Sequence, residues 1–94
     1  MKIEGIIWHR DVVDKLFFKH KVETHEVEEV LSGKPKVRFV EKGERKDEDV
    51  YIALGQTIGC RYLSVFFIYK MTKEALILSA RDMAKKERRQ YDKK

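Results

Sequence analysis

The chain has 94 residues, enough for one hydrophobic core and too few for two, so a single domain over residues 1–94 is expected. Hydrophobic residues make up 43% of the chain and charged residues 39%, a balance that excludes a disordered protein. The net charge is +5, and residues 70–94 hold all of this excess, with nine Lys or Arg against four Asp or Glu. The expected partner is therefore acidic and meets the C-terminal quarter.

The sequence carries no signal for export, membrane insertion or metal binding. Its longest apolar run, 63–69, is far below the roughly 20 residues that a membrane span needs, and the first residues lack the apolar block of a signal peptide. The single Cys60 excludes an internal disulfide, and no group of Cys and His has the spacing of a zinc site. We therefore expect a cytoplasmic protein with no metal, no cofactor and no membrane association.

The N-terminal third of the chain predicts a strand and two helices. Residues 3–8 alternate in the manner of a short strand. Apolar residues then recur at helical spacing over residues 10–20, which predicts an amphipathic helix. A second, short helix follows, with Thr24 as its expected N-cap and Gly33 and Pro35 as its stop.

The rest of the chain predicts strands and a last helix. The expected elements are a strand from Lys36, an exposed charged hairpin loop over 41–49, and strands over 50–54, 60–69 and 74–79. The strand over 50–54 ends at Gly55, and the strand over 60–69 is apolar on both faces, which indicates a central position. A helix with few apolar residues is predicted from Asp82 to about Lys93. The expected fold is α+β, with an N-terminal strand, two helices, an antiparallel sheet of about four strands and a C-terminal helix.

The most informative stretch surrounds this last helix. Arg81 is expected where a strand ends and a helix begins, and such a junction binds anions through backbone N–H groups and the guanidinium. Glu87 and Tyr91 are four residues apart and share a helix face, flanked by the cations Lys85 and Arg88. A carboxylate and a phenol beside fixed cations can bind a phosphodiester and move protons. The alternative is a solvated basic helix in which Tyr91 packs and Glu87 pairs with a neighbouring cation.

Three further candidates lie outside that stretch. Arg61, at the start of the predicted central strand, is either a second phosphate-binding group or an ordinary strand-end arginine. His20, beside Lys19 at the end of the first helix, suits proton transfer near neutral pH, or the two residues only stabilise the helix dipole. Tyr62 or Tyr69 would stack on RNA bases if exposed.

Several of these features occur in a familiar order. They are Trp8, the helix end Lys19-His20-Lys21-Val22, Gly55, Arg61, the triplet Ser79-Ala80-Arg81, Glu87-Arg88-Arg89 and Tyr91. This order resembles the BrnT toxins of bacterial type II toxin–antitoxin pairs, within the wider RelE/ParE superfamily, and the resemblance covers nearly the whole chain. Two positions depart from the family pattern. Lys21 stands where the family usually has a glycine that permits a left-handed helix end, and Cys60 precedes Arg61 in place of the usual glycine.

The resemblance implies a small RelE/ParE-like ribonuclease that needs no metal and forms an inactive oligomer with a cognate antitoxin. In this chemistry the 2′-hydroxyl of the RNA attacks the adjacent phosphorus and leaves a cyclic phosphate. Arg61 and Arg81 would then stabilise the phosphorane together. The residues implied for the remaining roles are Glu87 or His20 as the base, Tyr91 or His20 as the acid, and Lys19, Lys85 and Arg88 as contacts to RNA.

Two other functional classes stay open at this point. One is a non-catalytic basic module that binds RNA or DNA, and the other is a superfamily relative that inhibits a protein target such as gyrase. The presence of Arg61 and Arg81 together with Glu87 and Tyr91 favours an enzyme over a degraded relative. Phosphate-binding arginines serve a binding module equally well, so these residues alone do not exclude one.

Overall fold

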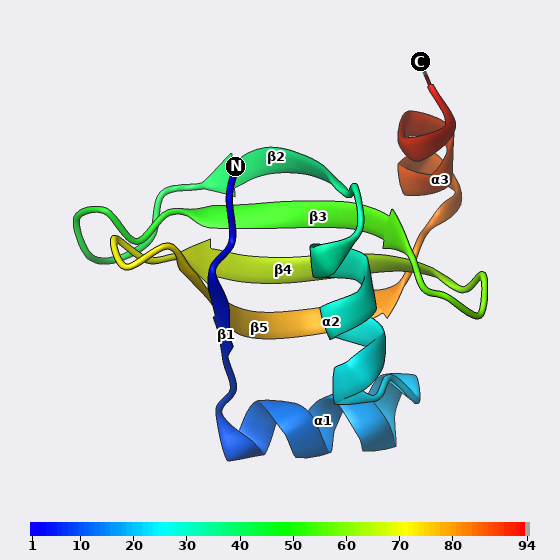
Figure 1. Ribbon diagram of the computed structural model, residues 1–94, viewed down its shortest axis with the longest axis horizontal. Coiled ribbons are helices and arrows are strands. Elements are labelled where there is room, and N and C mark those ends of the chain that lie inside the picture. The colour runs from blue at the N-terminus through cyan, green and yellow to red at the C-terminus, as the bar shows by residue number, and fades with distance from the viewer. Residues whose placement is uncertain (94) are drawn as a thin grey trace.

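The computed structural model describes residues 1–93, in which five strands and three helices follow one another (Figure 1). In chain order the elements are β1 (Gly5–Ile7), α1 (Arg10–His20), α2 (Thr24–Ser32), β2 (Lys36–Glu41), β3 (Val50–Gln56), β4 (Tyr62–Tyr69), β5 (Glu74–Asp82) and α3 (Lys85–Asp92). The predicted α+β class and the predicted order of helices and strands are confirmed.

The strands form one sheet in the order β1-β5-β4-β3-β2. Strands β2 to β5 pair antiparallel in chain order, and β4 is central, as the sequence predicts. The expected sheet of about four strands is one strand too small, because β1 pairs parallel with β5 at the sheet edge. A parallel neighbour needs a long crossover, and all the elements between β1 and β5 supply it here.

One face of the sheet carries the core, and helices α1 and α2 pack on it (Figure 1). We call this the helical face. The β4 side chains Leu63, Val65 and Phe67 point into it and are each 0% exposed. The helices add Leu16 from α1 and Val27, Val30 and Leu31 from α2. Burial of an aliphatic or aromatic side chain contributes roughly 1.5–3 kcal/mol, so these contacts fix both helices on this face.

The prediction that β3 ends at Gly55 is wrong, because the strand continues through Gln56. A Cβ atom placed on Gly55 would lie 2.7 Å from Cγ1 of Val30 on α2. A Cβ atom at this position would force Val30 or the helix to shift. The glycine therefore serves the close approach of α2 to the sheet rather than a turn.

The helix ends follow from local hydrogen bonds. Helix α1 spans the predicted residues, and Lys21 after it is left-handed, with φ 56° and ψ 36°. The predicted N-cap of α2, Thr24, is wrong by one residue. Glu23 is the N-cap, and its backbone N–H donates to Oε1 of Glu26 at 3.0 Å. This bond is half of a reciprocal capping pair, which places the start of the helix after Glu23 rather than after Thr24.

Strand β5 is longer than the sequence predicts, and its length moves Arg81 into the sheet. The predicted strand end at Ser79 and helix start at Asp82 are wrong by three residues, because β5 continues to Asp82 and α3 begins at Lys85. The last three residues of β5 pair with Val65, Ser64 and Leu63 of β4. Pairing with the central strand thus outweighs the helix propensity of these residues.

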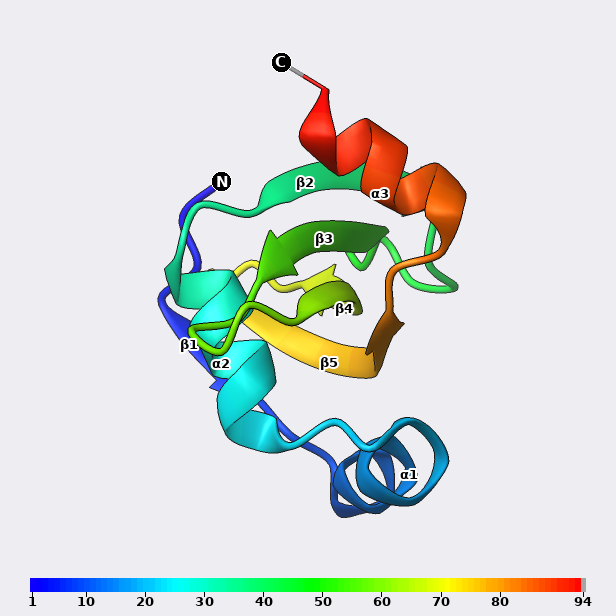
Figure 2. The same cartoon turned by 90° about the vertical axis from the view of Figure 1, so that its right-hand side faces the viewer.

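The end of β5 sends neighbouring side chains to opposite faces. Asp82 lies opposite Leu63 and therefore on the helical face, whereas Arg81 lies opposite Ser64 on the other side, which we call the outer face. Figure 2 shows α2 and α3 on the two sides of the sheet, with α3 along the outer face. Functional groups at this end of the sheet are consequently divided between two surfaces.

Candidate functional site

An arginine and a glutamate form a bidentate ion pair on the outer face. Arg81 projects from β5, and Glu87 projects from the first turn of α3. The Nη1–Oε1 and Nη2–Oε2 distances are both 2.7 Å. Two parallel N–H···O bonds fix the plane of the guanidinium as well as its position. The pair therefore connects the strand to the helix and holds Arg81 in one orientation.

The carboxylate of Glu87 accepts two further hydrogen bonds. The Ser64 hydroxyl donates to Oε1 at 2.9 Å, and the backbone N–H of Ala84 donates to the same oxygen at 2.8 Å. Burial of the carboxylate, the largest single influence, raises its pKa. The bonds from Arg81, Ala84 and Ser64 together outweigh burial, so the pKa of Glu87 lies below its ordinary value. Glu87 is therefore ionised at neutral pH.

Arg81 keeps donors that a ligand can use. Its Nη1 also donates to the backbone carbonyl of Asp82 at 3.2 Å. Within residues 1–93, nothing accepts from Nε or from the second N–H of Nη2. The side chain is 35% exposed, and the hydrogen bond to Glu87 is the main cause that raises the guanidinium pKa. A fixed, permanently charged guanidinium with unused donors suits a phosphate group.

Aromatic and cationic side chains lie beside this pair, between β4 and α3. The guanidinium carbon of Arg88 is 3.5 Å from the centre of the Tyr62 ring, and the Tyr91 ring meets Tyr62 edge-on with 5.9 Å between ring centres. Lys36 of β2 donates to the backbone carbonyl of Tyr91 at the end of α3. Tyr91 thus packs against the sheet, while Lys85 and Arg88 line a pocket with Tyr62.

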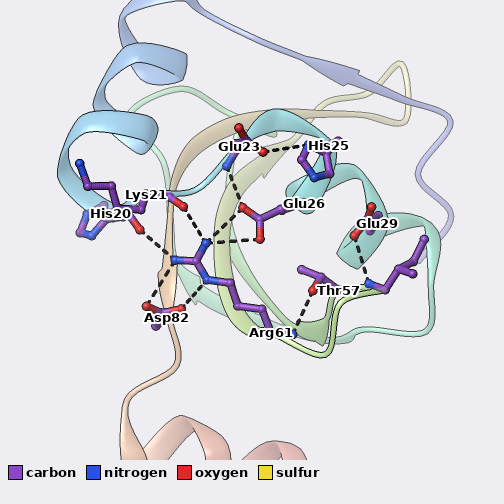
Figure 3. Close-up of polar contacts among 10 residues, drawn as sticks. His20, Lys21, Glu23, His25, Glu26, Glu29, Thr57, Arg61 and Asp82 are labelled. Carbon is purple, nitrogen blue, oxygen red and sulfur yellow. Dashed lines mark hydrogen bonds and ion pairs between the residues drawn. The ribbon is translucent and has the colours of Figure 1, made fainter.

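Arg61 lies on the helical face, where all five of its N–H groups are used (Figure 3). Its Nε and Nη2 donate to the two carboxylate oxygens of Asp82 at 2.7 and 3.4 Å. Its Nη1 donates to the Lys21 carbonyl at 2.7 Å and to Glu26 at 3.1 Å. The remaining N–H of Nη2 donates to the His20 carbonyl at 2.9 Å. The hydrogen bond to Asp82 is the main cause that raises the pKa of Arg61.

These contacts make Arg61 a connector between three elements. The two carbonyls belong to the end of α1 and the turn after it, Glu26 to the first turn of α2, and Asp82 to the end of β5. The Arg61 side chain is 27% exposed, and Glu26 is 16% exposed. A guanidinium with every donor paired in this way holds the corner between α1 and α2 against the sheet.

The structure divides the predicted site residues into two groups. Arg81, Glu87, Tyr91, Lys85 and Arg88 lie on the outer face or on α3, whereas Arg61, His20 and Lys19 lie on the helical face or at the end of α1. The expected convergence of Arg61 and Arg81 on one phosphate is therefore not the arrangement found. Both guanidiniums donate to Asp82, Arg61 to its carboxylate and Arg81 to its backbone carbonyl, but the two side chains start on opposite faces of the sheet and Arg61 has every donor occupied.

Three residues of these clusters, Ser64, Asp82 and Glu26, are not among the predicted site residues. Ser64 is 0% exposed, and a single hydroxyl within the apolar run of β4 is the signal that marks it. Asp82 carries no such signal, because only the register that pairs it with Leu63 places it beside Arg61. Glu87 pairs with Arg81 across the sheet–helix junction, and not with a neighbouring cation of its own helix.

Two other features bear on the kind of site. Among residues 1–93, no group of three or more His, Cys, Asp or Glu side chains is placed to hold a metal ion. In the same part of the chain, no helix combines the length and the apolar character needed to cross a bilayer.

Comparison with known proteins identifies the family that the sequence motifs indicate. The family model described as ribonuclease toxin, BrnT, of type II toxin–antitoxin system matches residues 8–87. The fold is similar to the crystal structure of the Brucella abortus ribonuclease toxin BrnT, with a TM-score of 0.62 and 22% identity, over 86% of this chain and 97% of that chain. No curated protein matches the sequence. The match includes Arg61, Arg81 and Glu87, and the chain therefore belongs to the BrnT family of ribonuclease toxins of type II toxin–antitoxin systems.

Proposed function

We propose that this endoribonuclease toxin cleaves RNA without a metal ion, by attack of the 2′-hydroxyl on the adjacent phosphorus, with Arg81 as the principal catalytic residue. One observation carries the proposal. Arg81 is held by two 2.7 Å bonds to Glu87, yet two of its N–H groups have no acceptor within residues 1–93. It is thus both oriented in advance and able to bind a further anion.

The reaction places its largest change of charge where Arg81 can act. The 2′-oxygen forms a bond to phosphorus, the bond from phosphorus to the 5′-oxygen breaks, and the products are a cyclic phosphate and a 5′-hydroxyl. Negative charge accumulates on the non-bridging oxygens of the phosphorane during this exchange. A guanidinium that already points at these oxygens stabilises the transition state without reorganising, an effect of about 2.7–4 kcal/mol for one such donor.

Glu87 is the proton acceptor closest to this arginine. Its low pKa in the free protein arises from Arg81, Ala84 and Ser64 acting against burial. A phosphate bound at the unused N–H groups of Arg81 brings negative charge close to the carboxylate, and this charge raises the pKa of Glu87 toward that of a useful base. We propose that Glu87 orients Arg81 before RNA binds and accepts the 2′-hydroxyl proton afterwards.

The leaving 5′-oxygen needs a proton, for which Tyr91 and His20 are the predicted donors. Tyr91 follows Glu87 by one helical turn, about 6 Å along the axis of α3. His20 ends α1 on the helical face, where its backbone carbonyl binds Arg61. The two placements favour Tyr91 as the acid.

Arg61 has a different proposed part, that of a positioning residue. Its donors are occupied, so it contributes indirectly: it holds Asp82, the residue after Arg81, at the end of β5, and its main effect is on the stability of the fold. Contacts to the RNA backbone fall to Lys85 and Arg88 on α3, with Lys19 at the end of α1 as a more distant contact.

The family implies a protein antitoxin as the partner of this chain. We propose that the antitoxin covers α3, because this helix has no buried side chain and carries much of the positive charge of the C-terminal quarter. Such a complex would block RNA and neutralise the basic surface in one step, and an oligomer of toxin and antitoxin is the expected form.

The mechanism is tested with purified protein, single-stranded RNA and an excess of metal chelator. We expect cleavage at internal positions, with a cyclic phosphate at the 3′ end of each upstream product. Intact RNA in the presence of folded protein would overturn the proposed activity, and cleavage that stops on addition of chelator would overturn the metal-free mechanism. RNA in which the 2′-hydroxyls are methylated provides the control, because it lacks the attacking group and must remain uncut.

A further inference from the structure

We propose that the pocket between β4 and α3 binds a nucleobase of the RNA, next to the phosphate at Arg81. This inference rests on the proposed function and extends it from the backbone of the RNA to its bases. The pocket has a volume of about 380 Å³, and its walls are Tyr62, Met83, Lys85, Arg88 and Arg89. A volume of this size falls within the range of small-ligand pockets, about 300–1,000 Å³.

Arg88 gives the pocket a flat surface. One face of its guanidinium lies on the Tyr62 ring, with 3.5 Å between the guanidinium carbon and the ring centre. Its Nε donates to the Asp92 carboxylate at 3.0 Å, which holds the plane in place, and the side chain remains 44% exposed. Unstacked RNA bases pack on aromatic rings and on arginine planes, so this stack can be extended by a base.

The charge of the pocket matches a nucleotide. Three of its five lining residues are cations, and none of the five is an acid. By contrast, a pocket of about 490 Å³ between β1 and α2 is lined by Glu4 and Glu28 and by no Lys or Arg. Met83 and the Tyr62 ring offer apolar surface for a base, while Lys85 and Arg89 offer charge for the phosphates beside it.

The position of the pocket links it to the proposed catalytic group. Tyr62 and Ser64 are two residues apart on β4 and so face the same side, about 7 Å from each other along the strand. Ser64 lies directly opposite Arg81 on β5. The Met83 backbone N–H donates to the Tyr62 carbonyl at 3.1 Å, which keeps the pocket beside the end of β5. A phosphate at Arg81 therefore has the adjoining base within reach of the pocket.

The test measures binding apart from cleavage. A short fluorescent RNA with 2′-O-methyl groups is titrated with the protein, and its anisotropy reports the affinity. Tyr62→Leu removes the ring and Arg88→Lys removes the plane while keeping the charge, and each is expected to weaken binding about tenfold. Tyr62→Phe keeps the ring and is expected to stay within about twofold of the parent. Arg45→Gln, in the loop between β2 and β3, is the control for loss of one surface charge, and its affinity is also expected to stay within about twofold of the parent.

A second series removes the base instead of the side chain. A single abasic site is moved along the same RNA. At one position it is expected to lower the affinity of the parent protein about tenfold, while the affinity of Tyr62→Leu, which already lacks the ring, should not fall any further. Unfolding curves establish that the variants are folded. If Tyr62→Leu loosens α3, the affinity of Arg88→Lys is the deciding measurement for the base pocket, because the Arg88 side chain is on the surface and its replacement leaves the fold intact.

Parent-like binding by both variants would overturn the base pocket. So would equal losses at the abasic position with and without the Tyr62 ring. The proposed ribonuclease mechanism fails separately, in the cleavage assay on unmodified RNA. A protein that cuts RNA but ignores the abasic site refutes only the pocket, and one that senses the abasic site but cuts nothing refutes only the mechanism.

Discussion

Arg61 and Arg81 stand at the same end of the sheet, each paired with a carboxylate, and differ in how many of their donors are used. Arg61, on the helical face, donates all five of its N–H groups to Asp82, Glu26 and two backbone carbonyls. Arg81, on the outer face, has two N–H groups without an acceptor in residues 1–93. The first arginine connects elements of secondary structure, and the second keeps donors that are available to a ligand.

The comparison shows that the number of remaining donors separates two kinds of arginine better than charge or exposure does. The side chains are similarly exposed, at 27% for Arg61 and 35% for Arg81. Neighbouring carboxylates raise the guanidinium pKa of both. Their hydrogen-bond partners differ clearly, and substitutions can test whether this difference also separates their effects on stability and on catalysis.

The largest effect is expected from Arg81→Ala. RNA cleavage should fall by about 10²–10³-fold, because one preorganised donor to the phosphorane is lost. Initial rates of cleavage with purified protein, and growth arrest at matched expression, measure this effect. Arg45→Ala removes a loop arginine with no part in either cluster and serves as the matched control. A variant at position 81 that cleaves as fast as the parent would show that Arg81 is not catalytic.

Arg61→Ala should instead act on stability. It leaves the carboxylate of Glu26 without its arginine and uncovers two backbone carbonyls, so we expect a loss of about 2–3 kcal/mol in the free energy of unfolding. Urea unfolding provides the value, and cleavage per folded molecule should stay within a few-fold of the parent. Unchanged stability together with abolished cleavage would reverse the roles that we assign to the two arginines.

Glu87→Gln tests the ion pair that holds Arg81. The folded pKa of Glu87 is lowered, so its contribution to stability is complete above the unfolded pKa and is lost as the pH falls through the folded pKa. At about pH 7 the variant should be about 1–2 kcal/mol less stable than the parent. As the pH falls below the ordinary glutamate pKa of about 4.3, the two unfolding curves should approach each other. A constant difference across this pH range would contradict an ionised Glu87 in the folded protein.

The smallest effect is expected from Lys21→Gly. Lys21 has φ 56°, and glycine accepts this left-handed conformation without the clash of a Cβ atom. The variant should gain about 0.5 kcal/mol, or roughly 2–4 °C in melting temperature, with cleavage unchanged. The Lys21 carbonyl that binds Arg61 belongs to the backbone and is retained. A fall in melting temperature would show that the lysine side chain matters more than the strain.

Local patterns in the sequence predict most of the fold. The apolar spacing of residues 10–20 gives α1 to the residue, and the run around Leu63 identifies the central strand, because both signals depend on neighbours in the chain. The predicted ends of strands are wrong where a contact with residues far away in the sequence determines the structure. Gly55 lies within β3 because Val30 packs on it, and Arg81 lies within β5 because Ser64 pairs with it.

The candidate site follows the same division. The family resemblance and the residues Arg81, Glu87, Lys85 and Arg88 are available from sequence, and the structure gathers these four at the junction of β5 and α3. The position of Arg61 on the opposite face cannot be predicted from the sequence, because strand alternation separates Asp82 from Arg81 only once the register with β4 is known. Spacing along the chain gives the members of a site, and pairing across the sheet gives the face on which each of them lies.

Helix α3 has no fully buried side chain, and the contacts that fasten it are polar or aromatic: Glu87 to Arg81, Lys36 to its terminal carbonyls, and the ring of Tyr91. Amide hydrogens of this helix should therefore exchange with solvent sooner than those of α1 or α2. Because Glu87 and Tyr91 sit on this segment, added salt would reduce turnover in two ways. It would screen the attraction between the protein and the RNA backbone, and it would weaken the ionic attachment of the helix that carries both of the proposed proton-transfer groups.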